Sequence, residues 1–259
     1  MLEMDYEGFK TKAFEITGID LTSYKQKQAE RRIGTLLKRL GVDTFDEYCR
    51  ILEKDAKARK DFLNYFTINV TEFFRTPIKF TELEKSVLPN LLNKNANGSL
   101  KIWSAGCSNG AEVYSLAIIL DELTPNGRHK FLATDIDDEM LKKAKAGVYG
   151  ENEMGQVSPQ RSAKYFQTSE KQFILSEKIR AKVDFKIHDL LNEPFEKEFD
   201  LILCRNVVIY FTEEAKDKLY VKFFNALKTG GVLFVGGTER IPNYMEIGFK
   251  SISPFFYQK

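Results

Sequence analysis

The stretch that decides the fold is LKIWSAGCSNGAEVYSLA, residues 100–117. Leu100 to Ala105 is a short apolar run, GCSNG is a loop with two glycines, and apolar side chains then recur at helical spacing through residues 111–123. A second apolar run, KFLATDID, ends in Asp135 and precedes a helix predicted from about residue 138 to 146. Because strand-like and helical segments alternate, we expect an α/β domain with a parallel sheet and helices on both faces.

The loop after the first predicted strand is a candidate ligand site. Ligands of such sheets bind at the carboxyl ends of the strands. Gly106 and Gly110 allow the backbone to approach a ligand there, and Asp135 can accept hydrogen bonds from both hydroxyls of a ribose. The loop does not match GxGxxG, and no GKT or GKS follows it, so phosphate binding is poorly supported. S-adenosylmethionine, which has a ribose and no phosphate, fits best, with a dinucleotide or a purely structural turn as alternatives.

A third stretch, FDLILCRNVVIYF at residues 199–211, is typical of a central strand. Its first half is almost wholly apolar, as a parallel strand buried on both faces requires. Arg205, Asn206 and Tyr210 follow, at the edge where we expect the active site. The segments GVLFVGG and FFYQK near the end of the chain predict two further strands of the same sheet.

The N-terminal part has no strand signal before residue 99 and predicts a small helical bundle. Helices are expected at residues 24–40, 45–52 and about 58–66. Residues 22–41 contain six Lys and Arg but one Glu, a net charge of +5, in a chain whose net charge is only +2. Such a balance excludes a general polyelectrolyte binder. The basic helix is therefore either a solvated face or a docking surface for an acidic macromolecule.

Composition limits the remaining possibilities. With 259 residues and 43% apolar residues, the chain has enough material for a core. The acidic N-terminus MLEMDYEGFK does not resemble a signal peptide, and no apolar run approaches the ~20 residues of a membrane span, so a cytoplasmic protein is expected. Cys49, Cys107 and Cys204 form no CxxC pair, and we therefore expect no metal site.

Several motifs together resemble the bacterial chemotaxis receptor glutamate O-methyltransferases, the CheR family. The matching segments are TINVTEFFR (67–75), IWSAGCSNGAEVYSLA (102–117), ATDID (133–137), CRNVVIYF (204–211) and GVLFVGGTE (231–239). The resemblance covers essentially the whole chain. It implies a Rossmann-like S-adenosylmethionine methyltransferase sheet with a small antiparallel β-subdomain inserted, preceded by an all-α N-terminal domain. The activity it implies is methyl transfer from S-adenosylmethionine to glutamate carboxylates of chemoreceptors, with S-adenosylhomocysteine as product.

The resemblance also implies roles for particular residues. Asn69, Thr71 and Arg75 would form a lid segment, Glu112 and Asp135 would hold the amino-acid and ribose parts of the cofactor, and Asp189 and Leu190 would lie beside adenine. The same pocket would include Ala105, Gly106, Arg205 and Asn206. Two features depart from the family pattern. GAEVY replaces the usual GEEPY, which puts Ala111 and Val113 in place of an acid and a proline. At the position of Asp189, the family often has Asn.

The chemistry requires orientation more than proton transfer. A glutamate carboxylate, with a reference pKa of ~4.3, is already an anion at neutral pH, so no general base is needed. A guanidinium can hold carboxylate oxygens in a fixed geometry, which makes Arg75 the first candidate catalytic residue. Tyr210 is the second, because its hydroxyl can reach a carboxylate oxygen or the sulfonium end of the cofactor. The alternatives are an exposed surface Arg75 and a core Tyr210.

The resemblance completes the predicted organisation. We expect a helical N-terminal domain at 1–76, a linker at 77–98 and a methyltransferase domain at 99–259, with the β-subdomain at 148–182. The latter lacks a Gly-rich loop, so we expect docking without a receptor C-terminal tether. The basic helix would dock acidic methylation helices of membrane chemoreceptors through Arg31, Arg32, Lys38 and Arg39.

Other partners are less favoured. We expect no nucleic-acid partner, no membrane insertion and a monomer. A methyltransferase of the same fold with a non-receptor substrate, and a non-catalytic cofactor-sensing module, remain alternatives.

Overall fold

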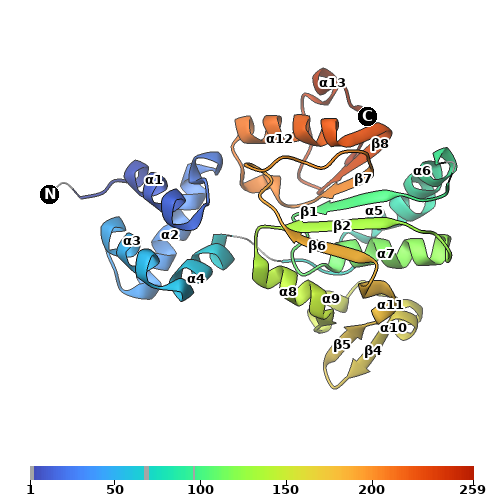
Figure 1. Ribbon diagram of the computed structural model, residues 1–259, viewed down its shortest axis with the longest axis horizontal. Coiled ribbons are helices and arrows are strands. Elements are labelled where there is room, and N and C mark those ends of the chain that lie inside the picture. The colour runs from blue at the N-terminus through green and yellow to red at the C-terminus, as the bar shows by residue number, and fades with distance from the viewer. Residues whose placement is uncertain (1–2, 67–69, 96) are drawn as a thin grey trace. The chain divides into compact units, whose positions relative to one another are not determined.

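The computed structural model describes residues 3–66, 70–95 and 97–259 (Figure 1). It divides into two compact units. The helical unit comprises Met1–Ile68 with Ile209–Lys218, and the sheet unit comprises Asn69–Val208 with Leu219–Lys259.

The helical unit contains the predicted bundle. Its helices are α1 (Tyr6–Thr17), α2 (Gln26–Leu40), α3 (Phe45–Lys54) and α4 (Ala56–Phe66), with a 3-10 turn at Leu21–Ser23. Phe9, Leu52 and Phe62 are fully buried between them. Thr44 caps α3 by accepting the N–H of Glu47. The predicted positions of α2, α3 and α4 are thus confirmed to within two residues at each end, whereas α1 was not predicted.

The segment around residue 211 also belongs to the helical unit. Tyr24 and Phe211 form an antiparallel bridge and an edge-to-face ring contact at 5.2 Å. The N–H of Thr212 donates to the carbonyl of Ser23 at 2.9 Å. The chain therefore leaves the sheet unit after Val208 and returns to it within α12 (Glu213–Ala226).

The large sheet of the sheet unit has the order β6-β2-β1-β7-β8-β10-β9 within the described residues. Its strands are β1 (Lys101–Ala105), β2 (Lys130–Asp135), β6 (Val183–Ile187), β7 (Phe199–Cys204), β8 (Leu227–Val235), β9 (Lys250–Ser253) and β10 (Phe256–Gln258). The five strands from β6 to β8 are parallel, and β10 pairs antiparallel with β8 on one side and with β9 on the other. The strand–turn–helix prediction for residues 100–123 and the two C-terminal strands are confirmed.

Helices cover both faces of this sheet. Ile102 of β1 belongs to the apolar cluster that includes α7 (Ala111–Leu123), whereas the adjacent Trp103 packs 5.6 Å from Phe223 of α12. Neighbouring residues of a strand point to opposite faces, so α7 and α12 lie on opposite sides. Further helical segments are α8 (Asp138–Ala146), a 3-10 turn at Val208–Tyr210 and α13 (Tyr244–Ile247).

Residues 77–98, which the sequence assigned to a linker, are largely helical. They contain α5 (Pro77–Glu82), a π-helical turn at Leu83–Val87 and α6 (Leu88–Lys94). Apolar side chains from this stretch recur at spacings of three or four residues and are buried in the sheet unit: Phe80, Leu83, Val87 and Leu91. This stretch therefore contributes to the core, and the domain boundaries themselves stay a prediction.

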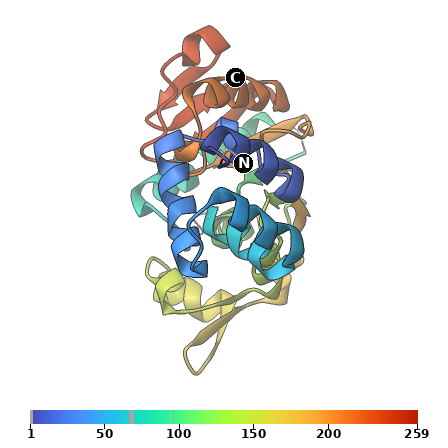
Figure 2. The same ribbon diagram turned by 90° about the vertical axis from the view of Figure 1, so that its left-hand side faces the viewer.

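A second, antiparallel sheet lies in the predicted insertion. Its order is β3 (Val148–Tyr149), β5 (Gln172–Leu175) and β4 (Phe166–Ser169), and short helices flank it at Glu151–Met154, Pro159–Tyr165 and Glu177–Arg180. The β4–β5 hairpin projects from the rest of the sheet unit, as the ochre hairpin in Figure 2 shows. The predicted fold class, including the insertion and the all-α N-terminal part, is confirmed.

Candidate active site

The loop after β1 is held closely against two neighbouring segments. The N–H groups of Gly106 and Cys107 both donate to the carbonyl of Thr134, at 2.8 and 2.9 Å. Gly106 has a φ of +74°, and a Cβ there would lie 2.5 Å from Cγ2 of Val207. Only glycine fits this position. The backbone after the buried Ala105 is thus fixed at the carboxyl edge of the sheet, as predicted.

Asp135 ends β2 at the same edge and is almost fully buried. Its Oδ2 accepts the N–H of Ser108 at 2.7 Å, and its Oδ1 accepts the N–H of Asp137 at 3.0 Å. Burial raises the pKa of Asp135, while these backbone N–H groups oppose the shift. A carboxylate has about four acceptor positions, so both oxygens can still receive ligand hydroxyls.

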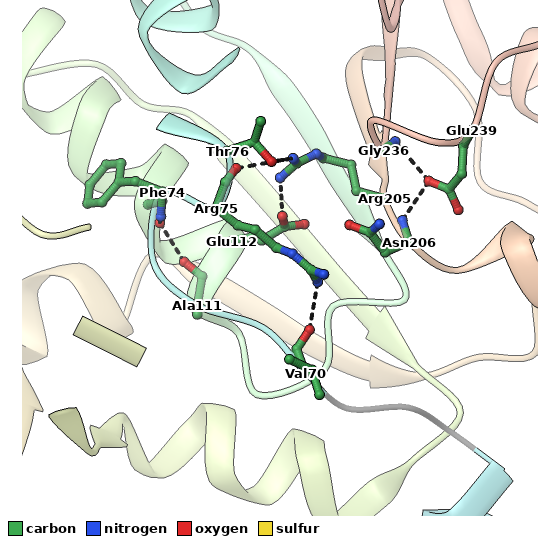
Figure 3. A network of polar contacts seen from close by, with 11 residues as sticks. Val70, Phe74, Arg75, Thr76, Ala111, Glu112, Arg205, Asn206, Gly236 and Glu239 are labelled. Carbon is green, nitrogen blue, oxygen red and sulfur yellow. Dashed lines mark hydrogen bonds and ion pairs between the residues drawn. The ribbon is translucent and has the colours of Figure 1, made fainter. Parts of the chain in front are cut away.

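A buried ion pair joins α7 to the end of β7. The guanidinium of Arg205 contacts the carboxylate of Glu112 and also donates to the carbonyl of Arg75 at 3.1 Å and the hydroxyl of Thr76 at 3.2 Å (Figure 3). Burial raises the pKa of Glu112, against the opposing effect of the Arg205 guanidinium. One side chain, Arg205, therefore connects three separate segments.

Arg75 lies on a segment that is anchored on both sides. Its guanidinium donates to the carbonyl of Val70 at 2.6 Å, and the N–H of Phe74 donates to the hydroxyl of Ser115 in α7 at 2.9 Å. Phe74 and Thr76 both have positive φ, 54° and 64°, so the backbone turns sharply on either side of Arg75. Thr71 is half-buried in the same segment, and Asn69 lies outside the described residues.

The turn at Asp189 and Leu190 follows β6. The N–H of His188 donates to the carbonyl of Asp135 at 3.0 Å, so this turn lies beside the end of β2. The Asp189 carboxylate accepts the N–H of Leu191 at 2.8 Å and the side-chain amide of Asn192, also at 2.8 Å. It therefore stabilises its own turn, and Leu190 is buried.

Tyr210 belongs to the helical unit, whereas Arg75 belongs to the sheet unit. Its carbonyl accepts the N–H of Lys25 at 3.0 Å. The catalytic role of Tyr210 stays a prediction.

Sequence reasoning missed one buried acid next to Asn206. The carboxylate of Glu239 accepts three backbone N–H groups, from Asn206 at 2.6 Å, Gly236 at 2.8 Å and Val208 at 2.9 Å (Figure 3). A Cβ on Gly236 would lie 2.4 Å from this carboxylate. The available signal was the motif GVLFVGGTE, whose last residue is Glu239.

The basic residues of α2 differ from one another in exposure. Arg31, Lys38 and Arg39 are exposed, but Arg32 is half-buried and donates to the carbonyl of Tyr65. The guanidinium groups of Arg32 and Arg39 each lie 4.8 Å from the centre of the Tyr65 ring.

In residues 3–66, 70–95 and 97–259, no group of three or more His, Cys, Asp and Glu side chains could hold a metal ion. No helix in the same ranges is long and apolar enough to cross a membrane.

The fold and the site together define the class. A mostly parallel sheet with a glycine turn after β1, a buried aspartate after β2 and no phosphate-binding motif has the donor set for S-adenosylmethionine. Residues 69–254 match the family described as CheR methyltransferase, SAM binding domain, and residues 4–67 match the CheR methyltransferase all-alpha domain. The chain belongs to the CheR methyltransferase family, and it is an S-adenosylmethionine-dependent methyltransferase.

Curated relatives extend over the same length. The chain is 41% identical over 258 residues to a chemotaxis protein methyltransferase of Listeria monocytogenes, with 100% of this chain and 98% of the relative covered. It is 35% identical to a probable chemotaxis protein methyltransferase of Rhizobium etli, covering 93% and 94% of the two chains. It is 33% identical to a chemotaxis protein methyltransferase of Salmonella typhimurium, covering 89% and 81%.

Proposed function

We propose that this methyltransferase converts glutamate side chains of chemoreceptors into glutamyl methyl esters. The names of the relatives support chemotaxis as the setting. The observation that carries the proposal is the anchored Arg75 segment, because it presents a guanidinium beside the buried Glu112–Arg205 pair. A guanidinium in this position can receive a substrate carboxylate.

The residues fit S-adenosylmethionine by their chemistry. Asp135 supplies acceptors for ribose hydroxyls, Glu112 is an anion suited to an ammonium group, and the Gly106 turn allows close approach of a ligand. When bound, this cofactor supplies an electrophilic methyl group on a sulfonium. The chain's own residues then have to orient the substrate carboxylate and exclude water, which can contribute several kcal/mol.

Arg75 is the proposed orienting residue. One of its terminal nitrogens is held by the carbonyl of Val70, which fixes the guanidinium plane, and its other N–H groups can donate to a carboxylate. Glutamate is ionised at neutral pH, so the acceptor oxygen needs no base. Tyr210 is proposed as the second catalytic residue.

Substrate docking is proposed on α2. Arg31, Lys38 and Arg39 are exposed and can attract the acidic methylation helices of a receptor, mainly by raising the association rate. Arg32 belongs to this face but also contacts Tyr65. Docking of this kind weakens as salt screens the charges.

Tether-independent docking is also proposed. In the insertion, Ser169 pairs with Gln172, so only Glu170 and Lys171 connect β4 to β5. This turn is too short to wrap around a peptide. We therefore expect the KM for a receptor to stay unchanged when its C-terminal residues are removed; an increase of tenfold or more would contradict tether independence.

The test of the proposed function is methyl transfer from labelled S-adenosylmethionine to receptor-containing membranes. A base-labile label is expected, because an ester hydrolyses in alkali. Alkali-stable label would indicate N-methylation, and label on no receptor but on another acceptor would indicate a different substrate. Cofactor binding without turnover on any receptor would favour a non-catalytic module.

A further inference from the structure

Glu239 is a buried acid for which the reaction described above has no use. It is 3% exposed, and its carboxylate accepts N–H groups from Asn206, Val208 and Gly236 at 2.6 to 2.9 Å. Hydrogen bonds to an ionised acceptor are roughly twice as strong as neutral ones. Such a carboxylate holds the backbone of the loop that leaves β7.

That loop contains two of the predicted cofactor residues, Arg205 and Asn206. Asn206 has a φ of 60°, a left-handed conformation that is uncommon for a residue other than glycine. Figure 3 shows its side-chain amide directed away from Glu239, toward the side on which Glu112 and Arg75 lie. The direction of this amide therefore depends on the backbone that Glu239 holds.

The approach of Glu239 to this loop is close. A Cβ on Gly236 would lie 2.4 Å from Oε2 of Glu239 and 2.8 Å from the backbone nitrogen of Asn206. Glycine at this position leaves room for the carboxylate to reach the loop. In the motif GVLFVGGTE, Gly236 thus leaves the space that the carboxylate of Glu239 occupies.

We propose that Glu239 is a positioning residue for the cofactor, which acts by holding Asn206 through its backbone N–H. The inference rests on the proposed function in that it takes Asn206 to contact the cofactor. If one of the two carboxylate oxygens of Glu239 is replaced, one or two of the three backbone N–H groups lose their acceptor. The loop that contains Asn206 then shifts. The Asn206 amide then loses its position.

The chain offers a matched control at the amino end of β7, the strand whose carboxyl end leads into the loop that Glu239 holds. Asp200, in β7, is 4% exposed, accepts the N–H of Lys101 at 2.7 Å and pairs with Lys228 at 2.8 Å. It is a buried acid on a backbone N–H, like Glu239, but it lies at the amino end of β7, away from the ligand edge. Asp200→Asn therefore reports the cost of changing a buried carboxylate alone.

The experiment measures the Kd for S-adenosylhomocysteine by calorimetry, together with the melting temperature, on the full chain. Glu239→Gln is expected to weaken binding about tenfold. Asp200→Asn is expected to lower the melting temperature without changing the Kd. Because Glu239 acts through Asn206, the double variant Glu239→Gln/Asn206→Ala is expected to bind as Asn206→Ala does.

The following results would overturn the proposal. One is an unchanged Kd in Glu239→Gln together with a melting temperature lowered as in Asp200→Asn. Another is a loss of affinity in the double variant that equals the sum of the two single losses. A further one is an unchanged Kd in Asn206→Ala. If Glu239→Gln does not fold, Gly236→Ala is used instead, because its methyl group displaces the carboxylate of Glu239 without removing it. An unchanged Kd in Gly236→Ala also overturns the proposal. Failure of the wild-type protein to methylate receptors would contradict the proposed function and leave these binding results valid.

Discussion

Arg32 of α2 donates a hydrogen bond from its guanidinium to the backbone carbonyl of Tyr65 in the last turn of α4. The carbonyls in the last turn of a helix have no partner within the helix, so a cation there stabilises the end. Burial lowers the pKa of the Arg32 guanidinium. Arg32 thus differs in its contacts from Arg31 and Lys38, which are exposed on the same helix.

Arg32→Ala is therefore expected to destabilise the protein. The loss of a hydrogen bond from a charged donor costs about 1.5 to 3 kcal/mol, and the ring contact with Tyr65 is lost as well. Thermal unfolding of Arg32→Ala and Arg31→Ala measures the difference. Equal melting temperatures of the two variants would contradict a structural role for Arg32.

Charge reversal at the exposed positions should affect the receptor substrate. We expect Arg31→Glu/Lys38→Glu to raise the KM for receptor about tenfold at low salt and to flatten its salt dependence, because electrostatic attraction is reversed. The Kd for cofactor should not change. Lys57→Glu, at an exposed position on α4, is the control for a charge change elsewhere in the helical unit. A wild-type KM in the double variant would mean that this face is only solvated.

Asp135 should make cofactor affinity depend on pH. Burial raises the pKa of Asp135 in the free protein above its ordinary value of 3.8, and ribose hydroxyls donate more strongly to the ionised form, in which both oxygens accept without a competing proton. Affinity should therefore fall as the pH drops toward the raised pKa and level off above it. Calorimetry at a series of pH values from neutral downward measures this slope.

The control for this pH dependence is Asp135→Asn. The variant should bind at least tenfold more weakly at neutral pH, because two charge-assisted hydrogen bonds of ~1.5 to 3 kcal/mol are lost or weakened. Its slope should be smaller than that of the wild type. The remaining slope would come from Glu112, whose pKa burial also raises. An unchanged slope and affinity would place the ribose elsewhere.

Arg75→Ala should lower kcat about a hundredfold with little loss of stability. The side chain is only half-buried, and its one hydrogen bond among the described contacts goes to the carbonyl of Val70. Losing an orienting group reduces the rate of the chemical step. Lys182→Ala is the control, since Lys182 pairs with the buried Asp121 and should change the melting temperature more than kcat. Parallel losses of kcat and stability in Arg75→Ala would mean that Arg75 is structural.

The sequence by itself determined the local elements of this protein. Strand, turn and helix over residues 100–123 follow from an apolar run, two glycines and a helical repeat, and each of these signals lies within a few residues. Gly106 and Asp135 could be predicted at the ligand edge because parallel strands all end there. Residues 77–94 were assigned to a linker because the stretch after Pro89 is polar, although Phe80, Leu83, Val87 and Leu91 recur at helical spacing.

Only the tertiary structure decided which distant side chains meet. Arg205 contacts Glu112 across 93 positions of sequence, and Glu239 holds Asn206 across 33. Such contacts depend on strand order and register, and they leave no periodic pattern in the chain. A lone glutamate after a strand is equally compatible with a solvated position, because sequence does not show whether it is buried. Folding buries Glu239, so backbone N–H groups replace water as the hydrogen-bond donors to its carboxylate. Its role could therefore be seen only in the packed structure.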